Sequence, residues 1–150
     1  MGREITVSTE VILPISVDET WAVLSDTPRM VELDPLIDGY EPQNGVVEEG
    51  TLNRVRSRVG PFPARLVTRT EVVEPPHRVV FESVSPSRPV RIRAEETLDA
   101  VEGACRIRVR ITVTPTLPLL GPLFGRVILR TMLTQRRRLL ERLRVEVADG

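Results

Sequence analysis

The chain has 150 residues, of which 41% are hydrophobic and 28% charged, so we expect a single globular domain spanning residues 1–150. The formal net charge is zero, which argues against a nucleic-acid partner. All 21 basic residues are Arg, so no Lys is available for Schiff-base chemistry. One Cys and one His exclude an internal disulfide and a multi-Cys or His-rich metal site, and we expect neither a metal nor another cofactor.

The first ten residues are polar and charged, unlike a signal peptide. No apolar run reaches the length that a bilayer-spanning helix needs. We therefore expect a cytoplasmic protein with no integral membrane segment. The sequence does not distinguish a monomer from a homodimer.

The N-terminal third predicts one strand and two short helices. Apolar and polar residues alternate from Glu4 to Leu13, as in a half-buried strand. Ser16 or Asp18 can cap the helix that follows, and Trp21 lies on its apolar side. A second short helix is predicted over Arg29–Leu33.

Alternating segments separated by turn residues fill the middle of the chain. Connections of hairpin length predict an antiparallel sheet with one solvated face. The predicted strands are Ile37–Pro42, which Val46 and Val47 extend by further pairing, Thr51–Val59, Phe62–Glu74, Arg78–Val84, Val90–Ala100 and Ala104–Thr114. Within Phe62–Glu74, the alternation places Val72 on the inner face and Val73 on the outer face.

Arginines recur on the predicted solvated face of at least four strands. A stripe of Arg is compatible with RNA binding, but the chain has only one Trp, one Tyr and three Phe to stack on bases. Glu71, Glu82 and Glu95 can pair with arginines across strands. We therefore expect a solvated ladder of ion pairs on this face.

The segment Pro118–Val147 predicts one long C-terminal helix, with no Pro or Gly between positions 126 and 149. Its apolar residues form a broad arc, which suits packing on a sheet. Arg136 lies within this arc. Two interpretations stay open: the guanidinium pairs with a carboxylate or reaches water, or it anchors a ligand.

This order of elements resembles the helix-grip fold of the START-like, or SRPBCC, superfamily and its polyketide cyclase/dehydrase-like family. The opening strand followed by Leu13-Pro14 and by Val17-Asp18-Glu19-Thr20-Trp21-Ala22-Val23-Leu24-Ser25-Asp26 is similar to the family's opening. Gly50-Thr51 and Glu74-Pro75-Pro76-His77-Arg78-Val79-Val80-Phe81 resemble two further family segments, although the spacing from Glu74 to the prolines is shorter here.

The resemblance implies an α+β fold in which a curved antiparallel sheet of six or seven strands wraps the long C-terminal helix. It implies two short helices after the first strand and a cavity, entered near those helices, for a hydrophobic lipid or polyketide-like ligand. The expected ligand-binding residues are Asn53, Val55, Ser57, Leu66, Thr68, Phe81, Ile92, Ile107, Val109, Met132 and Arg136; Thr70, Ser83 and Glu96 are further polar residues predicted to face inward.

No motif requires a catalytic activity. Glu96 and Arg136 are the one inward acid–base pair that a cyclase or dehydrase could use, and they are equally compatible with a structural ion pair. His77 falls in a predicted turn, and Cys105 is expected to be a small buried hydrophobe. The leading hypothesis is binding or transport of a hydrophobic small molecule; a polyketide aromatase/cyclase or dehydrase and a protein-interaction module are the alternatives.

Overall fold

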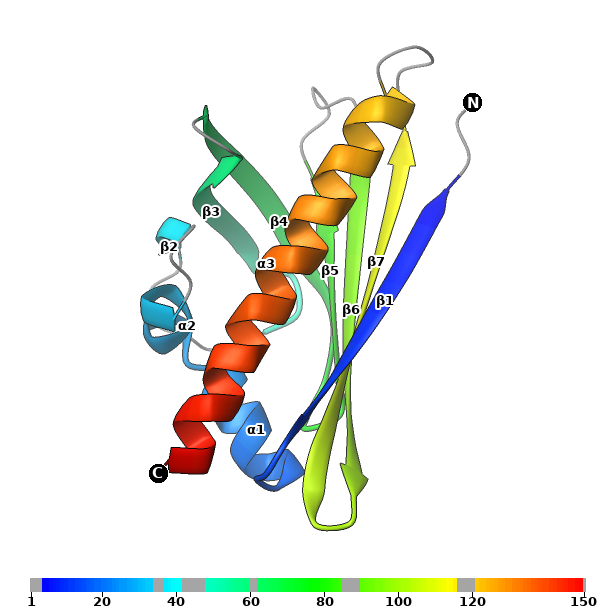
Figure 1. The fold of residues 1–150 in the computed structure, drawn as a ribbon. Coiled ribbons are helices and arrows are strands. Elements are labelled where there is room, and N and C mark those ends of the chain that lie inside the picture. The colour runs from blue at the N-terminus through cyan, green and yellow to red at the C-terminus, as the bar shows by residue number, and fades with distance from the viewer. Residues whose placement is uncertain are drawn as a thin grey trace.

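A computed structural model describes residues 4–33, 37–41, 48–59, 62–84, 90–115 and 121–149. In these residues one strand, two short helices, six further strands and one long helix follow each other in the predicted order (Figure 1). The elements are β1 (Ile5–Leu13), α1 (Val17–Leu24), α2 (Thr27–Leu33), β2 (Ile37–Glu41), β3 (Leu52–Val59), β4 (Phe62–Glu74), β5 (Arg78–Ser83), β6 (Val90–Val101), β7 (Ala104–Pro115) and α3 (Gly121–Asp149).

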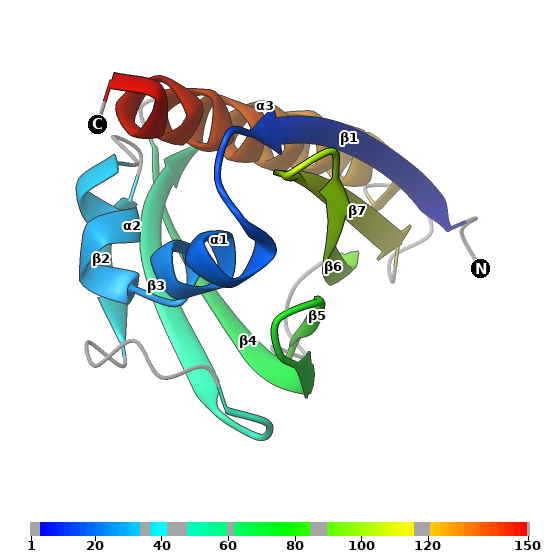
Figure 2. The same ribbon diagram turned by 90° about the horizontal axis from the view of Figure 1, so that it is seen from below.

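The strands form one antiparallel sheet in the order β1-β7-β6-β5-β4-β3-β2. Strands β2 to β7 therefore follow each other as neighbours, and only β1 pairs out of chain order, with β7. The sheet is strongly curved, and α1 and α3 lie on its concave side (Figure 2). The α+β helix-grip fold is confirmed.

Helix α3 packs on β1, β7 and β6. Its Leu139, Leu140 and Leu143 are buried together with Ile107 and Ile111 of β7. Along β7 the buried apolar side chains alternate with arginines, so one face of the strand supplies the core. The core thus fastens the helix to one half of the sheet.

The first helix begins where the sequence predicts. Ser16 is its N-cap, and the Ser16 hydroxyl accepts a hydrogen bond of 3.1 Å from the backbone N–H of Glu19. Trp21 packs against the core with part of its surface exposed. The buried residue of α1 is Thr20, which the sequence did not single out.

A β-bulge in β4 makes the predicted faces of Val72 and Val73 wrong. The pairing of β4 with β5 shifts register between Thr70 and Val72, so that Val73 lies opposite Val79. Directly paired residues share a face, and the extra residue at Glu71 reverses the alternation that follows. Val73 therefore turns inward and Val72 outward.

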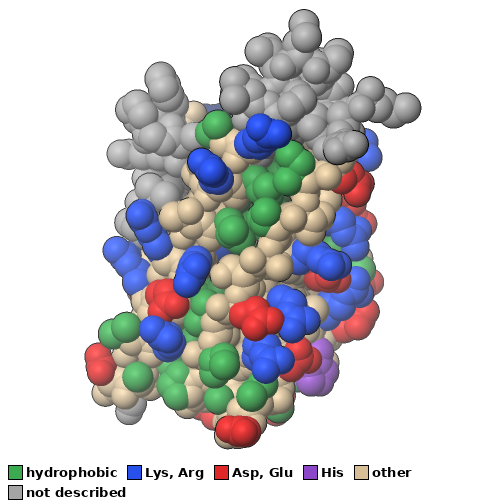
Figure 3. Space-filling view, turned by 45° about the vertical axis from the view of Figure 1, so that its right-hand side comes forward, with side chains coloured by type: hydrophobic (Ala, Val, Ile, Leu, Met, Phe, Trp, Pro, Cys, Tyr) green, Lys and Arg blue, Asp and Glu red, His purple; other side chains and the backbone are tan. Residues whose placement is uncertain are grey.

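Ion pairs connect the strands on the convex face. Arg78 donates to Glu95 at 2.7 Å and to Glu74 at 3.0 Å, and Arg108 lies 2.8 Å from Glu10. The hydrogen bond with Glu95, reinforced by Glu74, raises the pKa of Arg78 above its ordinary value. Figure 3 shows acidic and basic side chains interleaved beside the single His. Such exposed pairs contribute little stability individually.

The other differences between the structure and the sequence prediction are small. Glu71 and Glu82 form no ion pair among the described residues, although Glu95 does. Helix α2 starts at Thr27, two residues earlier than predicted, and α3 starts at Gly121. The expected pairing of Val46 and Val47 lies outside the described residues. No helix in the described part of the chain is long and apolar enough to cross a membrane.

We expect Leu140→Ala to lower the free energy of unfolding by about 2–5 kcal/mol, because the side chain is fully buried and its removal leaves a cavity under α3. Val127→Ala, on the same helix but 48% exposed, should change it by about 0.5 kcal/mol or less. Urea unfolding followed by circular dichroism measures both. Equal effects of the two substitutions would contradict this account of the core.

Candidate functional site

The concave face of β3, β4 and β5 is the candidate site. Among the described residues, no helix packs on these strands as α3 packs on β1, β7 and β6. Figure 2 shows β4 and β5 curving away from the helix. On this part of the face Val55, Leu66, Thr68 and Phe81 are partly accessible to solvent, although Asn53, Thr70 and Val79 are buried. The side chains that face α3 on β7 are all fully buried.

Strand register identifies the side chains that share this face. Thr70 of β4 lies opposite Phe81 of β5, which lies opposite Ala94 of β6, which lies opposite the core residue Ile111 of β7. Because directly opposed residues of an antiparallel pair point to the same side, this whole row faces α3. Glu96 belongs to the neighbouring row on the same face.

The predicted ligand-binding residues fall into two groups. Ile92, Ile107 and Val109 are at most 4% exposed and belong to the packed core. The side chain of Ser57 lies outside the described part of the chain. Leu66 and Met132 are half-buried and pack against this core. The other members face the less covered region; they are the buried Asn53 and the half-buried Val55, Thr68, Phe81 and Arg136.

A polar cluster lies on β3 and β4. The Asn53 side-chain nitrogen Nδ2 donates to the Thr70 hydroxyl at 2.9 Å and to the Thr68 hydroxyl at 3.4 Å. Asn53 is 5% exposed and Thr70 1% exposed, so these groups have lost most of their water. The two hydroxyl protons and the amide oxygen of Asn53 have no partner among the described residues.

The predicted pair of Glu96 and Arg136 forms. The Arg136 nitrogen Nη2 lies 2.6 Å from one Glu96 carboxylate oxygen and 2.7 Å from the other. The Glu96 side chain is 7% exposed and that of Arg136 is 26% exposed. The pair thus spans from β6 to α3 at the border between the packed core and the uncovered face. An ion pair in such a site neutralises both charges without water.

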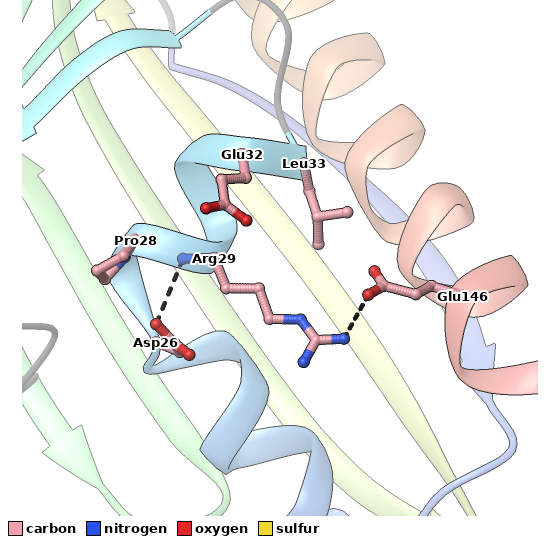
Figure 4. Close-up of a pocket in the computed structure, with 6 residues that line it drawn as sticks. All are labelled: Asp26, Pro28, Arg29, Glu32, Leu33 and Glu146. Atoms are coloured by element: carbon pink, nitrogen blue, oxygen red, sulfur yellow. Dashed lines mark hydrogen bonds and ion pairs between the residues drawn. The ribbon is translucent and has the colours of Figure 1, made fainter. Parts of the chain in front are cut away.

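A separate hollow of about 380 Å³ lies between α2 and the end of α3 (Figure 4). Arg29 of α2 crosses it to bind Glu146 of α3 at 2.6 Å, and Arg142 donates to the Leu33 carbonyl oxygen at 3.1 Å. These contacts connect α2 to α3 at the end where the sequence predicts ligand entry. Sequence reasoning missed them, because exposed charges on two distant helices carry no signal for their partner.

The remaining reactive side chains have structural surroundings. His77 has its ring nitrogen Nδ1 at 3.0 Å from the Leu98 carbonyl oxygen. Cys105 is buried in the core, and this burial raises the pKa of its thiol; a hydrogen bond with Thr20 opposes the increase only in part. Within the described ranges, no group of three His, Cys, Asp or Glu side chains is placed to hold a metal ion.

The helix-grip fold can be compared with known proteins. The model of the family described as polyketide cyclase/dehydrase and lipid transport matches residues 4–148. The chain belongs to this family. No curated protein sequence matches the chain.

Solved structures agree with this fold. The aromatase/cyclase ZhuI from Streptomyces sp. R1128 is similar at 15% identity, with 99% of this chain and 99% of that chain covered and a TM-score of 0.74. A START superfamily protein from Mycobacterium smegmatis gives 14% identity, coverage of 96% and 97%, and a TM-score of 0.71. A point mutant of norcoclaurine synthase from Thalictrum flavum, in complex with a transition-state analogue, is 16% identical, with 93% of this chain and 96% of that chain covered and a TM-score of 0.63. At these identities the likeness shows the fold alone.

We expect the two halves of the ion pair to contribute unequally to stability. Arg136→Leu leaves a buried carboxylate without its counter-ion and should lower the free energy of unfolding by about 3–5 kcal/mol. Glu96→Leu should cost about 1–2 kcal/mol, because the more exposed Arg136 can turn towards water. The double substitution should cost less than Arg136→Leu alone. Additive effects in urea unfolding would show that the pair is not coupled.

Cys105 should react slowly with iodoacetamide in the folded protein and at least tenfold faster in denaturant, as mass spectrometry can measure. Because its folded pKa is raised, its contribution to stability is complete below the ordinary thiol pKa and is lost as the pH rises through the folded pKa. Equal alkylation rates with and without denaturant would contradict the buried placement.

Proposed function

We propose that this domain binds a hydrophobic small molecule, such as a lipid or polyketide-like compound, between α3 and the concave face of β3, β4 and β5. The observation that carries the proposal is the partial exposure of apolar side chains on a part of the concave face that the described helices contact less closely than α3 contacts β1 and β7. Val55, Leu66 and Phe81 keep contact with solvent there, while the same face of β7 is fully buried.

A ligand at this face would remove apolar protein surface from water. Each square ångström so buried is worth about 25 cal/mol, so even a modest ligand gains binding free energy. The few polar groups on the face, from Asn53, Thr70 and Glu96, match the usual composition of small-molecule sites, which are mostly apolar with a few oriented polar groups.

The route of entry that we propose passes α2. The hollow beside α2 is bordered by Arg29, Glu32 and Glu146, and the two α2–α3 contacts there are exposed. Exposed ion pairs are worth about 0–1 kcal/mol, so the contact between Arg29 and Glu146 costs little to break. Met30 anchors α2 in the core, so the movement that we propose is confined to the solvent side of the helix. This supports exchange of the ligand with the surrounding solution.

The second candidate function is a polyketide cyclase or dehydrase, and the contact between Glu96 and Arg136 is the observation that favours it. A carboxylate at the face can accept a proton from carbon next to a carbonyl, and a nearby guanidinium stabilises the oxygen that gains charge. If the domain is catalytic in this way, Glu96→Gln will retain ligand binding and lose turnover. Retained turnover would remove Glu96 as the base.

The binding proposal is tested with the neutral apolar dye N-phenyl-1-naphthylamine, whose fluorescence increases in apolar surroundings. Thr68→Trp places a bulky ring on the concave face of β4 and should weaken dye binding at least tenfold by filling the space. Arg69→Trp is the matched control, because the next residue of the same strand points to the convex face and is exposed.

Dye binding by the wild-type protein and by Arg69→Trp, and its loss in Thr68→Trp, is the expected result. Circular dichroism and thermal melting establish that both variants are folded. No saturable binding to the wild-type protein, or equal binding by the two variants, would overturn the proposed site.

A further inference from the structure

The concave face carries two separate polar stations. The first, on β3 and β4, consists of Asn53 and Thr70 with the half-buried Thr68. The second, between β6 and α3, is the ion pair of Glu96 and Arg136. Both project to the same side of the sheet, because the rows of paired residues that contain them are neighbours on the concave face.

Apolar side chains separate the two stations. Phe81 lies opposite Thr70, and Val79, two residues earlier on β5, lies opposite Glu96. Two strand spacings and two residues along a strand place the Cα atoms of Thr70 and Glu96 about 12 Å apart, before any shortening by the curvature of the sheet. A ligand that touches both stations must therefore have an apolar body of roughly that length.

The chemistry of each station selects a neutral group. The Asn53 cluster offers one amide acceptor and two hydroxyl donors, which suits a hydroxyl or carbonyl oxygen. At the second station the charges of Glu96 and Arg136 already cancel. A charged ligand group would leave an uncompensated charge in a poorly solvated site, whereas a hydroxyl can donate to the remaining lone pairs of the carboxylate.

We propose that the preferred ligands are neutral molecules with a rigid apolar body and a hydrogen-bonding oxygen at each end. This inference rests on the proposed binding function and specifies its ligand class. One oxygen binds at Asn53 and Thr70, and the other, as a hydroxyl, donates to Glu96. Phe81 and Val79 contact the apolar body between them.

The test uses saturated tetracyclic steroid skeletons that carry a hydroxyl at both ends, at either end alone, or a carboxylate in place of one hydroxyl. Displacement of N-phenyl-1-naphthylamine measures their affinity. The wild-type protein should bind the diol about tenfold more tightly than either mono-ol, since one hydrogen bond in a dry site is worth about that factor. The carboxylate should bind more weakly than the diol.

Two variants assign the stations. The joint substitution of Glu96→Leu and Arg136→Leu, which leaves no unpaired charge, should abolish the advantage of the diol over one mono-ol. Thr70→Val, which keeps the shape of the side chain, should reduce the advantage of the diol over the other mono-ol. Glu82→Gln on the convex face should leave both advantages intact. If the leucine pair fails to fold, the joint substitution of both residues with Met replaces it, because the Met thioether is only a weak hydrogen-bond acceptor.

The outcomes separate this inference from the proposed function. Dye binding with equal affinities for the diol and the mono-ols, or with an advantage that survives in both variants, would overturn the ligand class while the binding function stands. Tighter binding of the carboxylate than of the diol would also overturn it. A wild-type protein that binds no dye would overturn both.

Discussion

The structure depends on a mismatch in shape between a straight helix and a curved sheet. Helix α3 has 29 residues and is therefore about 44 Å long. The sheet has seven twisted strands, and a straight cylinder can follow only part of its concave side. The buried leucines of α3 fasten it to β1, β7 and β6. Strands β5, β4 and β3 curve away, and among the described residues no helix contacts them as closely as α3 contacts β1 and β7.

This arrangement divides one face of one sheet into two environments. On β7, inward side chains such as Ile107 and Val113 have no exposed surface and contribute to the core. On β4 and β5, residues of the same face such as Leu66 and Phe81 remain half-buried. The same alternation of apolar and polar residues therefore serves stability at one end of the sheet and is available for recognition at the other.

The Glu96–Arg136 pair lies where these two environments meet, and this position explains its form. A single charge on the apolar arc of α3 would be costly, and a carboxylate on the inner face of β6 would be equally so. With the Arg136 nitrogen Nη2 at 2.6 Å from a Glu96 carboxylate oxygen, each charge compensates the other. The pair need not increase stability relative to two apolar residues, because desolvation of the ions opposes their attraction. Its place on the face that we propose for binding suits the recognition role that we propose for it.

The periodicity of the sequence predicted most of the fold, because the alternation within strands and the apolar arc of the long helix each repeat over many residues. Strand alternation gave the bounds of β4 without error, and the apolar arc gave α3. The bulge at Glu71 could not be predicted, because Val72 and Val73 are both apolar and β-branched, so either can face inward. Pairing of Glu96 with Arg136 could be proposed because each is the one inward charge of its element.

The contact between Arg29 and Glu146 had no such signal, since each lies on a helix surface that carries other charges and 117 positions separate them. The buried role of Thr20 was missed for a related reason: a threonine on a short helix is ordinarily a surface residue, and here it packs beside Cys105 because α1 closes the end of β6 and β7. Tertiary contacts between isolated residues leave no periodic pattern in a sequence.

The same geometry bears on the choice between a binding protein and an enzyme. Catalysis requires that an acid or base be held close to the reacting atom in a fixed orientation. Among the described residues of the concave face, Glu96 is the one carboxylate, and His77 lies in a turn with its ring at a backbone carbonyl oxygen. Binding requires only apolar surface and a few oriented hydrogen-bonding groups, which β3, β4, β5 and the ion pair together provide. The arrangement therefore favours the binding function that we propose, and among the described residues of this face a reaction would depend on Glu96.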